Sequence, residues 1–266
     1  MTTKPSVGYH SIVALYSPTA SEQTAVLRAA NVASKLHSQV TLVHVVPAGS
    51  AVEAEAATMD RLLAENAEIA AAKSTHGDLL QLAPQANAVN GDLVVLDNVG
   101  FAQLQPLLQA DDEAIPEQTE CDVLVVHANR PPVDYRHIVV AADLDDQGLM
   151  TIYKAVRMAK RYNARLTLLN VVDNFTAGKD EENAAKNLRM RGLEAFTSVI
   201  EGLEVEQEVV VTTGPVDQMV SNYSARQQAG LIVIGSYKLQ GLHILLGTTA
   251  KRVIETANCD VLVVHE

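Results

Sequence analysis

The chain has 266 residues, of which 20 are Lys or Arg and 32 are Asp or Glu, and its formal net charge at pH 7 is −12. Such a surface repels phosphate backbones, and no cluster of Lys and Arg offsets it locally, which argues against nucleic-acid binding. The first residues lack the apolar core of a signal peptide and no run approaches membrane-spanning length, so we expect a cytoplasmic protein without a membrane partner.

Short apolar runs alternate with longer helical stretches, which is the pattern of a parallel sheet with crossover helices. In the first half, the expected strands are Ser11–Tyr16, Gln39–Val46, Asp92–Leu96 and Asp122–His127. The expected helices are Glu22–Leu36, Ala51–Ala72, Leu79–Ala88 and one within Leu104–Glu117. A further strand belongs between Ala72 and Gly77, where the pattern is weak.

The second half shows the same alternation more clearly. Its expected strands are His137–Ala142, Arg165–Val172, Glu206–Thr212, Leu231–Gly235 and Val261–His265. Its expected helices are Gly148–Tyr162, Lys179–Leu203, Val216–Gln228 and Thr248–Ala257. A polar, proline-rich segment separates the halves, and the length suits two domains of ordinary size. We therefore expect domains at residues 1–128 and 137–266, joined by a linker at 129–136.

One sequence of seven residues, Cys-Asp-Val-Leu-Val-Val-His, occurs at Cys121–His127 and again at Cys259–His265. Other strand pairs match in the same order, which indicates two copies of one domain rather than a solenoid. Each copy has one cysteine just ahead of its last strand. A disulfide between them requires the two strand starts to meet, and a buried, reduced, apolar role for each is the preferred interpretation.

Several segments of the second half resemble the universal stress protein family in its tandem two-domain form. They are Ile138–Asp143, Gly214–Pro215, Gly230–Ser236, Leu245–Thr249 and the closing Cys-Asp-Val-Leu-Val-Val. The resemblance implies an α/β fold of two tandem Rossmann-like domains of the adenine nucleotide alpha hydrolase type. Each domain is then a five-stranded parallel sheet flanked by helices, and the last strands pair to form an internal pseudo-dimer.

The same resemblance implies an ATP site in the second domain. Nucleotide-binding members carry an aspartate after the first strand and a G-x2-G-x9-G-[ST] loop after the fourth, and glycine amides followed by a helix N-terminus suit a phosphate. The residues assigned on this basis are Asp143 and Val171 for base and ribose, and Gly235, Lys238, Gly247 and Thr248 for the phosphates. Two features depart from the family pattern. Lys238 replaces the middle glycine, and the spacing from Gly235 to Gly247 is one residue short.

The corresponding positions of the first half do not keep this pattern. Gln109 and Ala110 replace the last glycine and the threonine, the acidic run Asp111–Glu113 follows them, and Ser17 replaces the aspartate. Carboxylates at a helix start repel an incoming phosphate. We therefore expect no ATP binding by the first half.

The segment that contains Asp143, Asp145 and Asp146 begins like a calcium-binding loop. The twelfth position of such a loop needs a bidentate Glu, and Lys154 stands there, which excludes this interpretation. Asp145 and Asp146 are better explained as helix caps in a solvated turn. For Asp143, a ligand role and this turn role both stay open. No nucleophile elbow, zinc spacing or catalytic triad is visible, so no catalytic residue or metal site is assigned.

Two functions remain after these exclusions. The first is a stress-response binding protein in which ATP, accompanied by magnesium, changes conformation or partner choice. The second is a nucleotide-independent protein-interaction module with both nucleotide sites eroded. Either function implies protein partners that the sequence does not identify, and either allows the pseudo-dimer to pair into a further homo-dimer. An ATP-hydrolysing or adenylating enzyme is only a formal third alternative.

Overall fold

The computed structural model describes residues 8–18, 23–47, 56–108, 121–128, 130–131, 133–143, 148–173, 178–200, 204–236 and 247–265. The first half contains β1 (Ser11–Tyr16), α1 (Thr24–Leu36), β2 (Gln39–Val46), α2 (Ala56–Glu65), β3 (Ile69–His76), the short 3-10 helix η1 (Leu79–Gln81), α3 (Leu82–Ala88), β4 (Leu93–Asp97), α4 (Asn98–Leu108) and β5 (Asp122–Val126). The second half contains β6 (His137–Ala141), α5 (Gly148–Tyr162), β7 (Arg165–Val172), α6 (Lys179–Ile200), β8 (Gln207–Thr213), α7 (Val216–Arg226), β9 (Leu231–Ser236), α8 (Thr248–Thr256) and β10 (Asp260–His265).

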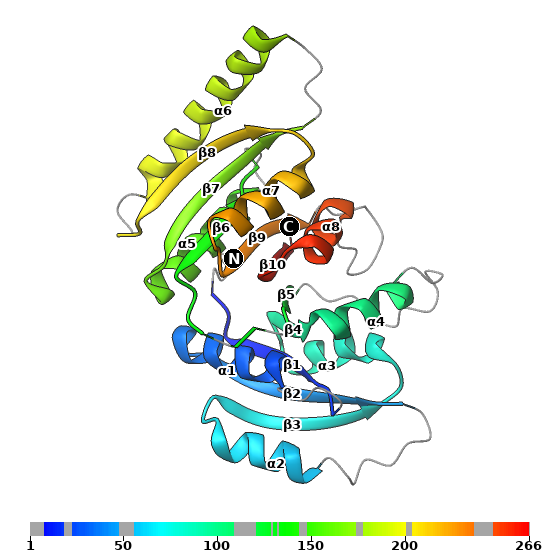
Figure 1. Ribbon diagram of the computed structural model, residues 1–266. Helices are drawn as coiled ribbons and strands as arrows, with labels where there is room; N and C mark the ends of the chain where they lie inside the picture. The colour runs from blue at the N-terminus through cyan, green and yellow to red at the C-terminus, as the bar shows by residue number, and fades with distance from the viewer. Residues whose placement is uncertain are drawn as a thin grey trace, which may run out of the picture.

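The ten strands that the structure describes form one sheet in the order β3-β2-β1-β4-β5-β10-β9-β6-β7-β8 (Figure 1). Within each half, the five strands pair in parallel. The halves join where β5 lies antiparallel to β10, with Leu124 opposite Leu262, and we name this contact the seam. This confirms the predicted α/β fold, with two five-stranded parallel sheets packed as a pseudo-dimer through their last strands.

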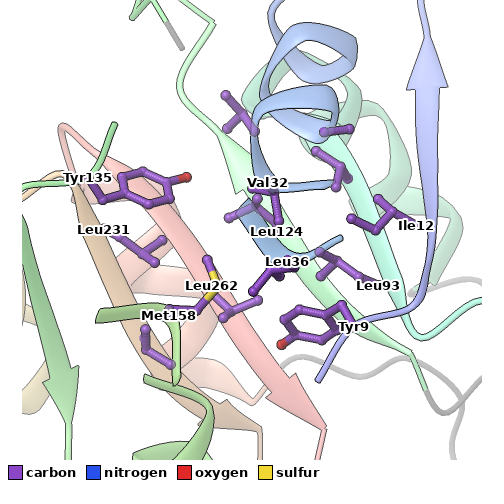
Figure 2. Packing of buried hydrophobic residues seen from close by; sticks show 14 of the residues in the cluster. Tyr9, Ile12, Val32, Leu36, Leu93, Leu124, Tyr135, Met158, Leu231 and Leu262 are labelled. Atoms are coloured by element: carbon purple, nitrogen blue, oxygen red, sulfur yellow. The ribbon is translucent and has the colours of Figure 1, made fainter. Parts of the chain in front are cut away.

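Two apolar layers cover the sheet, one on each face. Successive residues of a strand point to opposite faces, so Ile12 contributes to one layer and Val13 to the other. The first layer lies beneath α1, α2, α5 and α6, and the second beneath α3, α4, α7 and α8. Figure 2 shows Leu36 and Leu124 of the first half near Leu262 of the second. Because each layer continues through both halves, the halves share one hydrophobic core.

The predicted helix Ala51–Ala72 is wrong over its last residues. Described from Ala56, α2 ends at Glu65, and the chain then enters β3 at Ile69, inside the predicted helix. Asn66 supports this end because its side-chain amide donates to the Leu62 carbonyl at 2.9 Å. β3 is an edge strand that is mostly not buried, so its alanine-rich sequence carries little of the apolar signal of a central strand.

The predicted helix within Leu104–Glu117 begins earlier than expected. α4 starts at Asn98, directly after β4, and the structure describes it as far as Leu108. The Asp97 carboxylate accepts a hydrogen bond from the Gly100 amide at 2.7 Å, which stabilises the helix start. The rest of the predicted range lies outside the described residues.

The aspartate of the first repeated motif joins the two halves. Asp122 is 1% exposed, and its carboxylate accepts a hydrogen bond from the Tyr9 hydroxyl of its own half. From the other half, Lys154 Nζ lies 2.6 Å from Asp122 Oδ2, and the His265 amide donates to Asp122 Oδ1 at 2.9 Å. Burial, followed by the Asp122 charge, raises the pKa of the Tyr9 phenol well above its usual value, so this hydroxyl stays a donor.

Asp260, the aspartate of the second motif, makes an equivalent set of contacts, now from the second half to the first. It accepts a hydrogen bond from Tyr135 of its own half at 2.8 Å and from the His127 amide of the first half at 3.0 Å. Arg28 Nε of α1 lies 2.9 Å from Asp260 Oδ2, and both side chains are at most 3% exposed. Each half therefore supplies the cation that neutralises the buried carboxylate of the other.

The two cysteines are free and buried, as the sequence favoured. Because β5 and β10 run antiparallel, Cys121 and Cys259 precede their strands at opposite ends of this pair, which rules out the disulfide alternative. Cys121 Sγ lies 2.9 Å from the Gly91 carbonyl oxygen. Burial, followed by the neighbouring Asp260 charge, raises the pKa of the Cys259 thiol to about 12.

Among the described residues, no helix is both long enough and apolar enough to cross a membrane. The longest, α6, spans 22 residues and carries three acidic side chains in its first turn.

We expect Arg28→Met to lower the free energy of unfolding by about 3–5 kcal/mol, because it leaves the Asp260 carboxylate buried without a countercharge. The matched control is Lys35→Met, which removes the partly exposed pair between Lys35 and Asp134. Solvent screening limits that loss to about 1 kcal/mol. Urea denaturation measures both variants, and equal losses would contradict the role given to Asp260.

We expect Cys259 to react slowly with iodoacetamide in the native protein at about pH 8, since its thiol has a raised pKa and almost no thiolate forms. Unfolding in urea should raise the labelling rate by roughly 100-fold or more. Mass spectrometry of the peptide that contains Cys259 measures this rate. Fast labelling of the folded protein would show that the thiol is accessible.

Candidate functional site

A pocket of about 640 Å³ opens at the carboxyl ends of the second-half strands. Its wall includes the residues that follow β6, the end of β7 and the end of β9, together with the first residues of α8. In the sheet, β6 lies between β7 and β9, which is the point where the strand order reverses. Open α/β sheets bind their ligands at this position, because the chain leaves the two neighbouring strands in opposite directions.

The structure brings together all the predicted site residues that it describes. The five that line the pocket are Asp143, Val171, Gly235, Gly247 and Thr248. They come from four different strand ends and helix starts, and folding alone places them around one cavity. Lys238 was also assigned to this site, and it lies outside the described residues, as do Asp145 and Asp146.

The start of α8 is open to an anion. Gly247 is the residue that precedes the helix, and no side chain caps the helix there among the described residues. Thr248 and Thr249 follow it and are exposed, and both line the pocket. Backbone amides of a first helical turn have no partners within the helix, so they point their hydrogens at the pocket with the positive end of the helix dipole.

Gly148 shapes the opposite side of the pocket. A β-carbon built on Gly148 would lie 2.5 Å from the Asp143 carbonyl oxygen, which is closer than side chains tolerate. The glycine therefore lets the start of α5 approach the backbone of Asp143. From the sequence, Gly148 was assigned only as the start of a helix. Its position five residues after Asp143 could have indicated this close approach.

Two further pocket residues were not predicted from the sequence. Asn170 of β7 is 4% exposed, and its side-chain amide donates to the Ala142 carbonyl at 2.8 Å, which ties the end of β7 to the end of β6. Its Oδ1 accepts no hydrogen bond from the described part of the chain. Arg189 of α6 is exposed and brings a positive charge to the pocket wall. Nothing in the local sequence of α6 identifies Arg189 among its neighbours.

α6 is held beside the pocket by its first turns. Thr213, the last residue of β8, donates a hydrogen bond from its hydroxyl to Glu182 at 2.8 Å. Lys186, one turn further along α6, lies 2.7 Å from the same Glu182 oxygen. The hydrogen bond from Lys186, followed by that from Thr213, lowers the pKa of Glu182, so the carboxylate stays charged at neutral pH. These contacts fix the helix that carries Arg189.

In the first half, α4 begins directly after β4 and packs on one face of the sheet. Its Phe101 and Leu104 are buried, and Gly100 lies so close to β1 that a β-carbon built on it would be 2.9 Å from Leu15 Cδ2. The first turn of α4 already receives a negative charge from the chain, since Asp97 accepts the Gly100 amide. The acidic residues on which the sequence prediction rested, Asp111–Glu113, lie outside the described residues.

Comparisons with known proteins agree with this description. The model of the universal stress protein family matches residues 134–265. A universal stress protein of Methanocaldococcus jannaschii is 32% identical over 143 residues, which cover 50% of this chain and 83% of the relative. Universal stress protein A homolog 1 of Coxiella burnetii is 29% identical over 138 residues, covering 49% of this chain and 96% of that protein.

Solved structures extend the similarity of fold to both halves. A protein of unknown function from Pseudomonas aeruginosa superposes with a TM-score of 0.72 at 20% identity, covering 97% of this chain and 93% of the other. A universal stress protein from Archaeoglobus fulgidus has a TM-score of 0.67 at 14% identity, and 98% of each chain is covered.

We expect Gly148→Ala to lower the free energy of unfolding by about 1–3 kcal/mol, because the added methyl group displaces the Asp143 backbone or the start of α5. The control is Gly178→Ala before α6, where an added β-carbon meets nothing within 4 Å. That change should stay within about 1 kcal/mol. Thermal or urea unfolding measures both, and a neutral Gly148→Ala would show that the approach to Asp143 is not close.

Proposed function

The chain belongs to the universal stress protein family, and we propose that it is a stress-response binding protein whose second half binds an adenine nucleotide such as ATP. The observation that carries this proposal is the convergence of Asp143, Val171, Gly235, Gly247 and Thr248 around one pocket at the point where the strand order reverses. Bound nucleotide would act as a switch of conformation or of partner choice.

The pocket suits the phosphates on one side. The free amides at the start of α8, the Thr248 hydroxyl and the flexible backbone at Gly247 can donate to phosphate oxygens. Arg189 adds a guanidinium group at the pocket wall, which can pair with an outer phosphate. These groups give the phosphate side of the pocket a positive potential, although Lys238 stands where the family loop has a glycine.

The base and ribose are proposed to lie toward β6 and β7. Val171 and Leu169 give this side apolar surface, and Asp143 places a carboxylate where it can accept from a ribose hydroxyl or a base amine. A volume of about 640 Å³ falls in the range of small-molecule pockets.

Magnesium is proposed to enter with the phosphates rather than to occupy a separate site. The described residues contain no group of three or more His, Cys, Asp or Glu side chains that could hold a metal ion. Magnesium commonly binds through substrate phosphates, one or two carboxylates and water. Asp143 and Asp173, which both line the pocket, are the carboxylates available for that role.

We also propose that residues 1–128 and 137–266 act as two domains with different roles, joined by a linker at 129–136. The second would respond to ligand, and the first would support the seam and meet protein partners. Pairing of whole chains into a homo-dimer is part of the same proposal. Because the halves share a core, we expect a ligand-induced change in the second to reach the first.

The nucleotide-independent interaction module is the second candidate. What favours it is the first half, where the Asp97 carboxylate already accepts a hydrogen bond at the start of α4. Lys238 and the short loop, which depart from the family pattern in the second half, support the same candidate. This candidate predicts that partner proteins bind equally well after all nucleotide is removed.

The test is calorimetric titration of nucleotide-stripped protein with ATP and magnesium, comparing Gly247→Glu with Gly178→Glu. Both variants add one negative charge, but only Gly247 lines the pocket. We expect micromolar binding at about one site per chain, kept by Gly178→Glu and lost by Gly247→Glu, since a carboxylate at the start of α8 repels phosphate.

Two results would contradict the proposal. Binding that survives Gly247→Glu would place the nucleotide elsewhere in the molecule. No binding by the unmodified protein, confirmed by an unchanged melting temperature with ATP, would leave the interaction module as the better function.

A further inference from the structure

A second cavity lies between α1 and α5, and it shares no lining residue with the pocket described above. It has a volume of about 770 Å³, and we name it the α1–α5 groove. The residues that line it are Ser34, Lys35, His37, Tyr153, Val156, Arg157, Lys160 and Arg161. One wall comes from each half of the chain, so the groove exists only because the halves pack together. Figure 1 shows where α1 and α5 lie in the two halves.

The groove is basic although the protein is acidic. The chain as a whole has a net charge of −12, yet neither α1 nor α5 contains a single Asp or Glu. Arg28 and Lys154 of these helices are used by the buried aspartates of the seam. The remaining cations of the two helices, Lys35, Arg157, Lys160 and Arg161, all line the groove. Arg157, Lys160 and Arg161 lie within five residues of one another on α5, so the expectation that no cluster of Lys and Arg offsets the acidic charge locally does not hold for this helix.

Few acidic side chains compensate these cations. Lys35 Nζ lies 2.5 Å from Asp134, so part of its charge is already paired. Within the ranges that the structure describes, Arg157, Lys160 and Arg161 make no ion pair. Lys160 and Arg161 are exposed, so their charges are available to a ligand.

Arg157 is held in place before any ligand arrives. Its guanidinium packs against Gly8, where a β-carbon would lie 2.3 Å from one terminal nitrogen. Its Nε is buried and has no hydrogen-bond partner in the described parts of the chain. The residue as a whole is partly exposed and lines the groove, so other atoms of its guanidinium can meet a ligand there.

The walls of the groove are fixed relative to each other. The Tyr162 hydroxyl at the end of α5 donates to Asn31 of α1 at 2.9 Å, which is a direct bond between the halves. Tyr162 also packs on Tyr135, with ring centroids 4.8 Å apart. A groove with rigid walls loses little conformational entropy when a ligand binds.

From these observations we infer that the α1–α5 groove binds a small molecule that carries two or more linked phosphate groups. Four cations around one groove match a chain of adjacent negative charges, and guanidinium groups bind phosphate oxygens in pairs. The volume falls in the range of small-molecule pockets, and Tyr153 adds partly exposed aromatic surface. A long nucleic acid fits less well, because the acidic surface beyond the groove would repel it. This site is independent of the pocket at β6, β7 and β9.

The probe is inorganic tripolyphosphate, titrated calorimetrically into the full-length protein at about 50 mM and about 200 mM salt. The variant Lys160→Gln/Arg161→Gln removes two exposed cations of the groove. The control, Lys179→Gln/Arg191→Gln, removes two exposed cations of α6 and changes the net charge equally. We expect roughly a tenfold or greater loss of affinity in the groove variant and less than about a twofold loss in the control.

A third variant separates the two sites. Gly247→Glu should leave tripolyphosphate binding at the groove unchanged, whatever it does to ATP. The inference would be overturned by no binding to the unmodified protein, by equal weakening in the groove variant and its control, or by loss of binding in Gly247→Glu. Tighter binding of a single-stranded oligonucleotide than of tripolyphosphate, with the same sensitivity to Lys160→Gln/Arg161→Gln, would overturn it in favour of a nucleic-acid surface.

Discussion

The arrangement of the molecule depends on two buried carboxylates that neither half can neutralise alone. Asp122 and Asp260 sit at the starts of the two strands that join the halves, and each is 1% exposed. A buried charge without a countercharge costs several kcal/mol, so the cation from the opposite half is a condition of folding rather than an addition to it. Lys154 and Arg28 meet that condition from helices that cover the same face of the sheet. The same exchange holds together the halves that form the antiparallel seam, the shared core and the groove between α1 and α5.

Around this common seam the halves differ at the carboxyl ends of their strands. In the second half, residues from β6, β7, β9 and α8 surround an open pocket. In the first half, α4 begins directly after β4 and packs Phe101 and Leu104 beneath it. The halves thus differ in how the chain continues after the fourth strand: α4 begins at the next residue, whereas α8 begins only at Thr248, after β9 has ended at Ser236.

How far the sequence could predict these features depends on how local each feature is. Central strands such as β9 are buried on both faces and stand out as apolar runs, whereas β3, at the sheet edge, is mostly not buried and resembles helix. Asp143 and Gly247 could be assigned because they follow recognisable strands in a known pattern. Arg189 and Asn170 could not, because their place at the pocket depends on how α6 and β7 pack. The repeated aspartates could be seen in the sequence, but the residues that pair with them lie in the other half. Nothing in the sequence near the motif identifies those partners.

Covalent fusion of the two copies changes what a mutation can do at the seam. In a dimer of identical chains, every substitution appears twice, so a change that helps one side of the interface is imposed on the other. Here Arg28 and Lys154 occupy equivalent positions, yet one presents a planar guanidinium to its aspartate and to the Tyr135 ring, and the other a compact ammonium. In one chain the two ends of the seam can therefore be changed independently, while the exchange of cations that links the halves is kept. The same independence allows a site to be altered in one half while that half still supplies the lysine or arginine that the other half needs.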